Sequence, residues 1–402
     1  MDGRKKLSNA YDMIIQQFKD RNTADYNRFP PFFIASLGAH YFNTVNEQTH
    51  IYTEAGMTVN TRLHIIMVAP QGQSKSFWLK QFLEHDNSII KGTMIQTDFE
   101  LRMSEAGYIG TIKFGDNNQI IETQGLCQEE KNSIVGIEEF SDLMKSMTAQ
   151  DYNIGLENEL LTTLDSGMAI KRLAAGKLEY RTNLTLWTAT QPARYNLTSG
   201  LGRRFLFIFN IPTEKSMQDL KIKRREAADI QVSESDMFEI KKKINDTFNE
   251  LAAKVDKVRF DKSFYDYMDM LNVVAYEEPL YERLALGYTI MKSEGFESEL
   301  VISPDATLKK MMKMEWGWRK KIKQGTEESM VWSLIESSNG MKHERCLEIL
   351  MDFGMAADDA RKSLRVLEKR GLIIIKDGDI TIKKKKEIVM SHEEMEQQMI
   401  NE

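Results

Sequence analysis

The 402-residue sequence has little cysteine and no long hydrophobic run. Its two cysteines, Cys127 and Cys346, are far apart and match no metal-binding spacing, and six scattered histidines add no zinc pattern. Such sparse cysteine usage is typical of a reducing compartment, so we expect a cytoplasmic protein. No apolar segment approaches the roughly 18 residues of a membrane span, and the basic start is followed by no apolar stretch. Neither a membrane partner nor a signal peptide is therefore expected.

The net charge of −6 excludes a uniformly basic protein that coats nucleic acid. However, residues 306–386 contain 19 Lys and Arg against 12 Asp and Glu, a net charge of +7, so the rest carries −13. The C-terminal part is the basic end of the chain. The length predicts two or three domains.

Hydrophobic patterning predicts an α/β fold. Residues 7–45 have the spacing of two helices, and residues 213–323 are predicted to be helical. Gly and Asn turns between alternating apolar residues predict a hairpin within residues 101–126, and residues 170–180 predict another. Residues 326–382 predict three helices and a hairpin with an Asp-Gly turn, which is the winged-helix pattern. Short apolar runs predict buried strands in the segments "TRLHIIMVAP", "NSIVGI", "LTLWTAT" and "RRFLFIF".

The segment "APQGQSKS" (69–76) joins a predicted strand to a predicted helix and is similar to the phosphate-binding pattern G-x-x-x-x-G-K-[ST]. Ala69 and Ser74 occupy the two glycine positions, and both are small enough for the backbone to approach a phosphate. Lys75 would contact the β and γ phosphates of ATP, and the Ser76 hydroxyl would ligate Mg²⁺. A surface turn before a helix is the alternative. The residues expected to hold the nucleotide are Pro70, Gln71, Gly72, Gln73, Ser74, Lys75, Ser76 and Phe77.

Two adjacent acids, Glu138 and Glu139, end the second predicted strand. Neighbouring carboxylates repel one another, so they favour a cation or a catalytic function. Glu138 would hold the metal through water, and Glu139 would polarise the attacking water. Capping of the following helix is a compatible alternative.

Two further positions complete the predicted catalytic site. Gln191 follows the third apolar strand and could orient the hydrolytic water. Arg203 and Arg204 precede the last strand, where an arginine can reach the γ-phosphate held by a neighbouring subunit. A surface ion pair is the commoner role of a single arginine.

The order of these parts resembles the AAA+ module of the minichromosome maintenance (MCM) family of replicative helicases. The family carries G-D-P-G-x-A-K-S, I-D-E-F-D-K-M, a hairpin with A-K-A-G, then A-A-x-N-P and S-R-F-D-L-I-F. This chain has "APQGQSKS", "IEEFSDLM", "IKRLAAGKLEY", "TATQP" and "GRRFLFIF" in the same order. The resemblance implies an AAA+ ATPase core that uses ATP and Mg²⁺ in a homo-oligomeric, hexameric ring.

The resemblance also implies individual roles. Gln191 would be the first sensor, Arg204 the trans-acting finger, and Arg283 a second sensor in the helical lid. The segment 107–125 would be the family's β insert, and the hairpin 170–180 would face the central channel, where Lys171, Arg172 and Lys177 touch DNA phosphates. The implied domains are an N-terminal helical segment (1–60), the ATPase core (61–215), a helical lid and linker (216–324), a winged helix (325–386) and an acidic tail (387–402).

This sequence departs from the family in Ala69, in Glu138 for aspartate and in Gln191 for asparagine. Only some sixty residues precede the first strand, so the N-terminal domain that encircles DNA is expected to be absent. A reduced relative carried by a virus or another mobile element, working with replication accessory proteins, would fit this pattern.

The last predicted helix of the winged-helix pattern would be the recognition helix, with Arg361, Lys362 and Arg365 available to contact DNA. Many winged helices instead contact proteins. The leading hypothesis is thus an ATP-driven DNA helicase or translocase. The alternatives are a replication initiator or helicase loader that binds an origin without unwinding, a scaffold with a degenerate site, and a packaging motor or regulator.

Overall fold

The chain forms two compact units, Met1–Thr326 and Glu327–Glu402. The computed structural model describes residues 8–45, 51–52, 58–70, 74–84, 88–101, 103–115, 119–140, 154–191, 200–211, 214–227, 234–323, 326–353 and 355–383. Among the described helices, none combines the length and the hydrophobicity needed to cross a bilayer.

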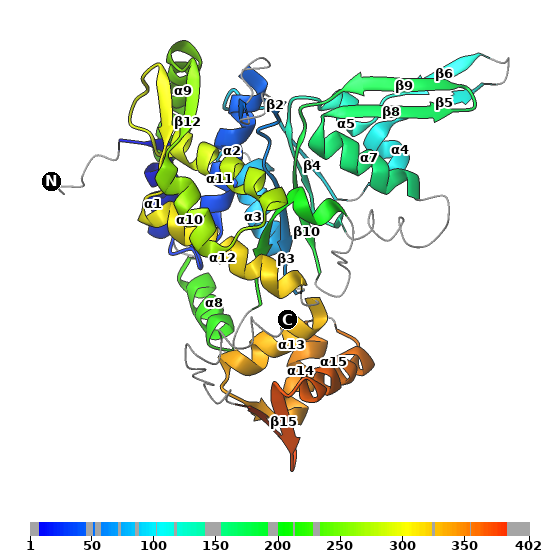
Figure 1. The fold of residues 1–402 in the computed structure, drawn as a ribbon, viewed down its shortest axis with the longest axis vertical. Helices are drawn as coiled ribbons and strands as arrows, with labels where there is room; N and C mark the ends of the chain where they lie inside the picture. Colours follow the sequence, from blue (N-terminus) through cyan, green and yellow to red (C-terminus); the bar gives the residue numbers. More distant parts are fainter. Residues whose placement is uncertain are drawn as a thin grey trace, which may run out of the picture. The chain divides into compact units, whose positions relative to one another are not determined.

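A five-stranded, wholly parallel sheet forms the centre of the first unit (Figure 1). In spatial order its strands are β11 (Phe205–Phe209), β3 (His64–Val68), β10 (Thr185–Thr190), β7 (Ile134–Ile137) and β4 (Thr97–Glu100). Every residue of the first four is buried, as expected for parallel strands covered on both faces. The predicted α/β class and its four buried strands are confirmed. We call the edge where the strands begin the amino edge and the opposite one the carboxyl edge.

Aromatic side chains fill the space between this sheet and its helices. Helix α3 (Lys75–Leu83) packs on the sheet, and helices α1 (Ala10–Asp20) and α2 (Pro30–Val45) add further rings. The Phe33 and Trp187 rings lie 5.0 Å apart, and the Trp187 indole donates a 2.7 Å hydrogen bond to Ser36. The two predicted N-terminal helices are therefore part of the core beside the sheet.

Helix α2 crosses helix α11 (Glu278–Lys292) with the two backbones in contact. A Cβ atom on Gly287 would lie 1.8 Å from the Ala35 carbonyl oxygen, and one on Gly38 would lie 2.4 Å from the Gly287 carbonyl oxygen. Only glycine leaves room for this approach. The helical region that follows the sheet thus shares one core with the N-terminal helices.

The region between residues 213 and 323 is not entirely helical. Strands β12 (Lys257–Phe260) and β13 (Glu299–Ile302) pair in parallel, and the expectation of helix throughout was wrong on this point. Each strand has four residues and its partner lies about 40 residues away, so no local pattern marks the pairing. The remaining elements here are α8 (Glu214–Ala227), α9 (Glu234–Lys254), α10 (Lys262–Leu271), the 3₁₀ helix η4 (Ala275–Glu277) and α12 (Ala306–Lys323).

Two β-hairpins run side by side away from the sheet (Figure 1). The first has β5 (Thr111–Phe114) and β6 (Ile120–Thr123), and the second has β8 (Met168–Leu173) and β9 (Gly176–Arg181). A small apolar cluster of Ile112, Ala175 and Leu178 joins them, and the Tyr180 hydroxyl donates a 2.8 Å hydrogen bond to the Ile109 carbonyl. Both hairpins predicted from the sequence are present.

Short elements connect the rest of this unit. They are the pair β1 (Ile51–Tyr52) and β2 (Thr58–Val59), helices α4 (Glu105–Ile109), α5 (Leu126–Glu129) and α7 (Ile154–Asp165), and the 3₁₀ helix η3 (Gly200–Arg203).

The second unit has three helices and a three-stranded antiparallel sheet of order β14-β16-β15. Its elements are α13 (Thr326–Ser337), β14 (Met341–Lys342), α14 (His343–Asp352), α15 (Ala357–Lys369), β15 (Ile373–Lys376) and β16 (Asp379–Ile382). The predicted Asp-Gly turn has positive φ at both central residues, 53° at Asp377 and 80° at Gly378, as a tight two-residue hairpin requires. Strand β14 is too short to have been predicted.

A buried polar network lies at the amino edge of the parallel sheet. His40 contacts the Asn132 carbonyl through Nε2 at 3.0 Å and the Thr185 hydroxyl through Nδ1 at 2.8 Å. The nitrogen that faces the carbonyl must donate, and in the neutral ring Nδ1 then accepts from the Thr185 hydroxyl. Burial lowers the pKa of His40 to about 3; donation to Asn132 opposes this shift, and the charge of Arg62 adds to it.

We predict that Gly287→Ala destabilises the first unit by about 3 kcal/mol, because the added methyl group must push two helices apart. Chemical denaturation measures the free energy of unfolding. Gly317→Ala is the matched control, since a Cβ on Gly317 meets nothing within 4 Å and alanine favours a helix by roughly 0.5–1 kcal/mol. Equal stability of the Gly287→Ala variant and the wild type would contradict the crossing.

His40 is also predicted to make the folded state sensitive to acid. The unfolded ring binds a proton below pH 6.5, whereas the folded ring resists it down to about pH 3, so stability is lost as the pH falls through this window. Between pH 7.5 and 5.5 the wild type should lose about 1.4 kcal/mol more than His40→Gln. Urea denaturation of both proteins at the two pH values measures this difference, and identical losses would refute it.

Candidate functional site

The phosphate-loop candidate leaves the carboxyl edge of the sheet at the end of β3. Ala69 and Pro70 are buried there, whereas Gln71, Gly72 and Gln73 lie outside the described residues. Ser74 has φ 61° and ψ 17°, a left-handed conformation at the position where the general pattern has glycine, and helix α3 begins directly after it. Ser74 thus adopts a conformation that glycine adopts more readily, at a position where the pattern has glycine.

Lys75 folds back over the loop that precedes it. Its Nζ atom donates hydrogen bonds of 2.8 Å to the carbonyl oxygens of both Ala69 and Pro70. The ammonium group thus lies against the end of β3 and is partly buried rather than extended into solvent. Phe77, in the first turn of the helix, is exposed, and its ring lies 5.1 Å from that of Trp78.

Ser76 and Glu138 meet although they come from segments 62 residues apart. The Ser76 hydroxyl donates a hydrogen bond to the Glu138 carboxylate, and Lys80 lies 3.9 Å from the other oxygen of the same group. The amide of Glu138 donates to the Glu100 carbonyl at 3.0 Å, which continues the pairing of β7 with β4. The first turn of α3 and the end of β7 therefore form one polar centre at the carboxyl edge.

Glu139 and Gln191 lie at the same edge. Glu139 follows Glu138 and is half-buried, and its amide donates to the Leu101 carbonyl at 3.2 Å. Gln191 directly follows β10, the strand between β3 and β7, and it is also half-buried. Strand order thus puts Gln191 between the loop and the acids.

The residues at this edge fit a magnesium ion. A serine hydroxyl and a carboxylate are the hard oxygen donors that Mg²⁺ prefers, and Mg²⁺ commonly takes only one or two protein ligands together with water and phosphate oxygens. Within the described ranges no group of three or more His, Cys, Asp or Glu is placed to hold a metal by itself. An ion held by Ser76 and Glu138 would complete its coordination with water and phosphate oxygens.

Arg204 lies at the opposite, amino edge of the sheet, just before β11. It is 7% exposed, and its guanidinium bonds within its own chain, to Asp165 at 2.9 Å and to the Leu161 carbonyl at 3.1 Å. Burial lowers the pKa of Arg204, and the charge of Asp165 opposes this shift. Arg203, by contrast, has an exposed side chain.

Arg283 on α11 is buried near the same group. Burial lowers its pKa, while the charges of Asp165 and Glu282 raise it and that of Arg204 lowers it. Within the part of the chain that is described, its Nε atom has no hydrogen-bond partner. The structure thus brings Arg283 to Arg204 and Asp165 rather than to the loop after β3, an association that no local sequence pattern signals.

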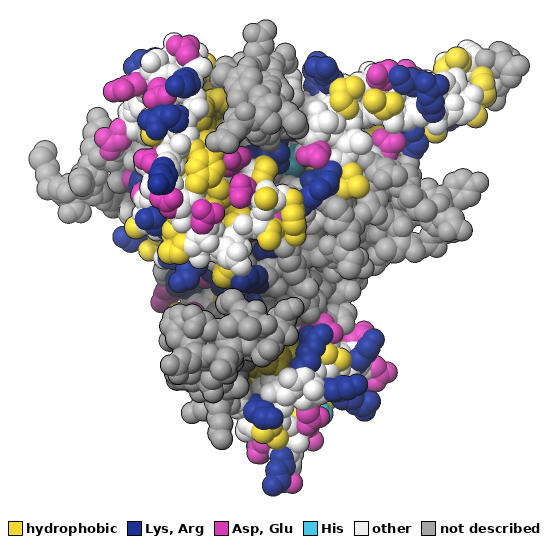
Figure 2. All heavy atoms as spheres, viewed as in Figure 1, with side chains coloured by type: hydrophobic (Ala, Val, Ile, Leu, Met, Phe, Trp, Pro, Cys, Tyr) yellow, Lys and Arg dark blue, Asp and Glu magenta, His cyan; other side chains and the backbone are white. Residues whose placement is uncertain are grey.

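The two hairpins carry basic and apolar side chains on one surface. Arg172 on β8 and Lys177 on β9 are cross-strand partners on either side of the turn, and Lys177 is ion-paired with Glu179. Lys171 precedes Arg172 on the same strand. Figure 2 shows basic and hydrophobic side chains side by side on these hairpins. The adjacent hairpin exposes Phe114 and Ile120, which are 56% and 63% exposed.

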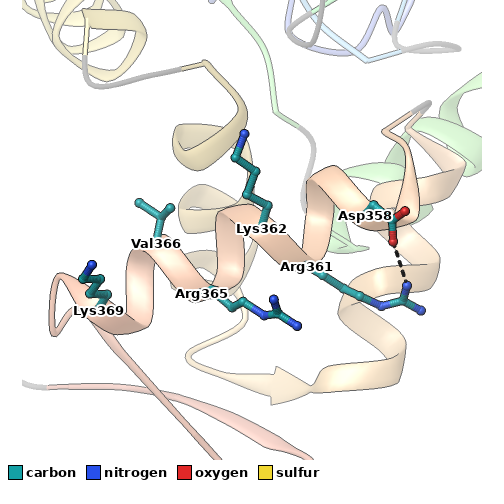
Figure 3. Close-up of a pocket in the computed structure, with 6 residues that line it drawn as sticks. All are labelled: Asp358, Arg361, Lys362, Arg365, Val366 and Lys369. Atoms are coloured by element: carbon teal, nitrogen blue, oxygen red, sulfur yellow. Dashed lines mark hydrogen bonds and ion pairs between the residues drawn. The ribbon is translucent and has the colours of Figure 1, made fainter.

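Helix α15 of the second unit carries a basic groove of about 360 Å³ (Figure 3). It is lined by Asp358, Arg361, Lys362, Arg365, Val366 and Lys369. Arg361 is ion-paired with Asp358 at 3.1 Å, whereas Lys362, Val366 and Lys369 lie along another side of the helix. The sequence analysis missed Lys369, although its spacing of seven residues from Lys362 put it on the same side.

Comparisons with known proteins add no family to this description. No model of a protein family matches the sequence, and no curated protein is significantly similar to it.

Proposed function

We propose that this protein is an ATPase of the AAA+ type, similar to the MCM helicases, that acts on DNA as a ring. The observation that carries the proposal is the hydrogen bond between Ser76 and Glu138. It joins a phosphate-loop-like turn to a strand-end acid across the intervening strand β10, in the arrangement that a shared metal and phosphate require. An ordinary surface turn before a helix would not need this partner.

Each residue at the carboxyl edge has a role in this proposal. Lys75 exchanges the carbonyl oxygens of Ala69 and Pro70 for phosphate oxygens when ATP binds. Ser76 and Glu138 would hold Mg²⁺, which would supply positive charge beside the phosphates. Glu139 polarises the attacking water, and Gln191 orients it.

The amino-edge arginines cannot serve the nucleotide held by their own loop, because the length of the sheet separates the two sites. They can serve a neighbouring subunit whose carboxyl edge faces them, and this supports a ring, for which we propose six members. Arg204 would have to leave Asp165 to act as the finger, whereas Arg203 is already exposed.

DNA is the proposed substrate of the ring. The hairpin residues Lys171, Arg172 and Lys177 supply cations beside exposed apolar side chains, a combination typical of surfaces that bind single strands. Helix α15 supplies a second basic surface through Arg361, Lys362 and Arg365, in a unit whose three helices and hairpin support the winged-helix interpretation.

The groove on α15 also favours a second candidate, an initiator or helicase loader that binds duplex DNA without unwinding it. A strand-displacement assay with a forked duplex and ATP separates the two functions. Processive unwinding by the protein alone would support the motor, and tight duplex binding without unwinding would support the loader.

Two substitutions test the ATPase. Lys75→Ala should weaken nucleotide binding at least about tenfold, because the loop loses its charged contact to the phosphates. Glu139→Gln should keep binding and lower turnover about 10²-fold or more, since it removes the base. Binding of a fluorescent ATP analogue and release of phosphate measure both effects. Glu239→Gln, the same change at an exposed position of α9, is the matched control. Wild-type turnover by Glu139→Gln would exclude Glu139 as the base.

The α15 surface is tested by salt dependence. Replacing Arg361, Lys362 and Arg365 with alanine should weaken duplex DNA binding and reduce the slope of log K against log salt by about 3, since each lost phosphate contact removes about 0.9. A control variant replaces Lys342 and Arg345 of the same unit, which are ion-paired with Asp379 and Glu348. If the triple variant keeps the wild-type slope, DNA does not bind at α15.

A further inference from the structure

Arg319 on helix α12 hydrogen-bonds the backbone on both sides of the Arg203–Arg204 pair. Its Nη1 atom donates a 2.7 Å hydrogen bond to the Gly202 carbonyl, and its Nη2 atom donates one of the same length to the Phe205 carbonyl. These two carbonyls directly flank the two arginines. A planar guanidinium holds two acceptors at a fixed separation, so this contact fixes the position of the dipeptide between them.

Arg319 is itself held rigidly. It is 2% exposed, and the Glu315 carboxylate, one turn earlier on α12, lies 2.7 Å from Nη2, while Glu277 lies 3.6 Å from Nη1. Burial disfavours the charge of Arg319, but the nearby Glu315 outweighs it, and the pKa of Arg319 is raised. The Phe207 ring covers the guanidinium at 4.7 Å.

Glu315 extends the same contact to the edge strand. Its Oε1 atom accepts the amide hydrogen of Phe207 on β11 at 3.1 Å, and its Oε2 atom accepts the Tyr281 hydroxyl at 2.5 Å. Helix α12 thus contacts β11 by packing and by the hydrogen bond from Phe207 to Glu315. Through Arg319 it also bonds the turn before β11. Well-packed hydrophobic residues often stabilise a core as well as a buried ion pair does, so stability alone does not explain the choice of charged residues here.

We propose that Arg319 is a positioning residue, which sets the Arg203–Arg204 pair so that it reaches the phosphate bound by a neighbouring subunit. The proposal rests on the proposed ATPase function and adds a residue that no sequence motif marks. With the backbone held on both sides, the two side chains diverge: Arg204 turns inward to Asp165, and Arg203 projects outward. Arg319 does not touch nucleotide, so it acts only through the arginine pair.

Two variants of the full-length protein test this role. Arg319→Lys keeps a cation between the carboxylates, but an ammonium lacks the planar fork that holds both carbonyls. A second, neutral variant combines Arg319→Met with Glu315→Gln and Glu277→Gln, so that no uncompensated buried charge remains. A displacement of about 1 Å costs roughly 10²-fold in rate, so kcat should fall about 10²-fold in either variant. Binding of a fluorescent ATP analogue should change less than about threefold, because each loop is intact.

Mixed assemblies separate positioning from a general structural effect. Subunits with Glu139→Gln turn over at least about 10²-fold more slowly than the wild type but carry correctly held arginines. When they are mixed with Arg319→Lys subunits, their arginines should act on the nucleotide held by a neighbouring Arg319→Lys subunit, whose loop and acids are intact. Turnover at these mixed sites should therefore be restored. Rescue supports the proposal, since a damaged site would not recover when a neighbour is replaced.

Two outcomes would overturn the positioning role itself. Wild-type kcat in both Arg319 variants would show that the hydrogen bonds to Gly202 and Phe205 are not needed for turnover. A lowered kcat without rescue would assign the effect to the subunit's own site or fold. Wild-type turnover by a double Arg203→Ala and Arg204→Ala variant, or no ATP turnover by the wild type, would instead remove the shared-site function on which the inference depends.

Discussion

All five strands of the central sheet run in the same direction, and the other features of the site follow from this constraint. Parallel strands bring their carboxyl ends to one edge, so that Lys75, Ser76, Glu138 and Gln191 gather there although 116 residues separate the first from the last. The same geometry sends residues that precede a strand, such as Arg204, to the opposite edge. One sheet therefore offers two chemically different edges, with the loop and acids at one and the arginines at the other.

Much of this arrangement was predictable because local sequence patterns mark the segments that form it. The buried strands are continuous apolar runs, the acids directly follow one of them, and a small-residue loop directly follows another. The hairpins carry turn residues, and the Asp-Gly turn adopts the expected positive φ angles. The Ser76–Glu138 contact follows once two such segments belong to one parallel sheet.

Other features depend on partners distant in sequence, and the sequence alone does not identify them. The pairing of β12 with β13 brings together two unremarkable four-residue segments. The sequence does not show that Asp165 lies beside Arg204 and Arg283. It also does not show that Arg319, one of many cations in a basic helix, bonds the carbonyls of Gly202 and Phe205. A backbone carbonyl can belong to any residue type. A side chain that bonds one therefore has no matching side chain that the sequence could indicate.

The glycine crossing of α2 and α11 has a consequence for biosynthesis. Helix α2 is buried along most of its length, yet Gly287, which receives it, follows Gly38 by 249 residues. At roughly 5–20 residues per second, a ribosome needs about 12–50 s to make that span. During this interval the apolar surface of α2 has no native cover from α11, and exposed apolar surface of this kind favours aggregation of a nascent chain. Completion of the first unit is in this sense a late event, which begins when α11 leaves the exit tunnel while residues that follow α11 are still being made.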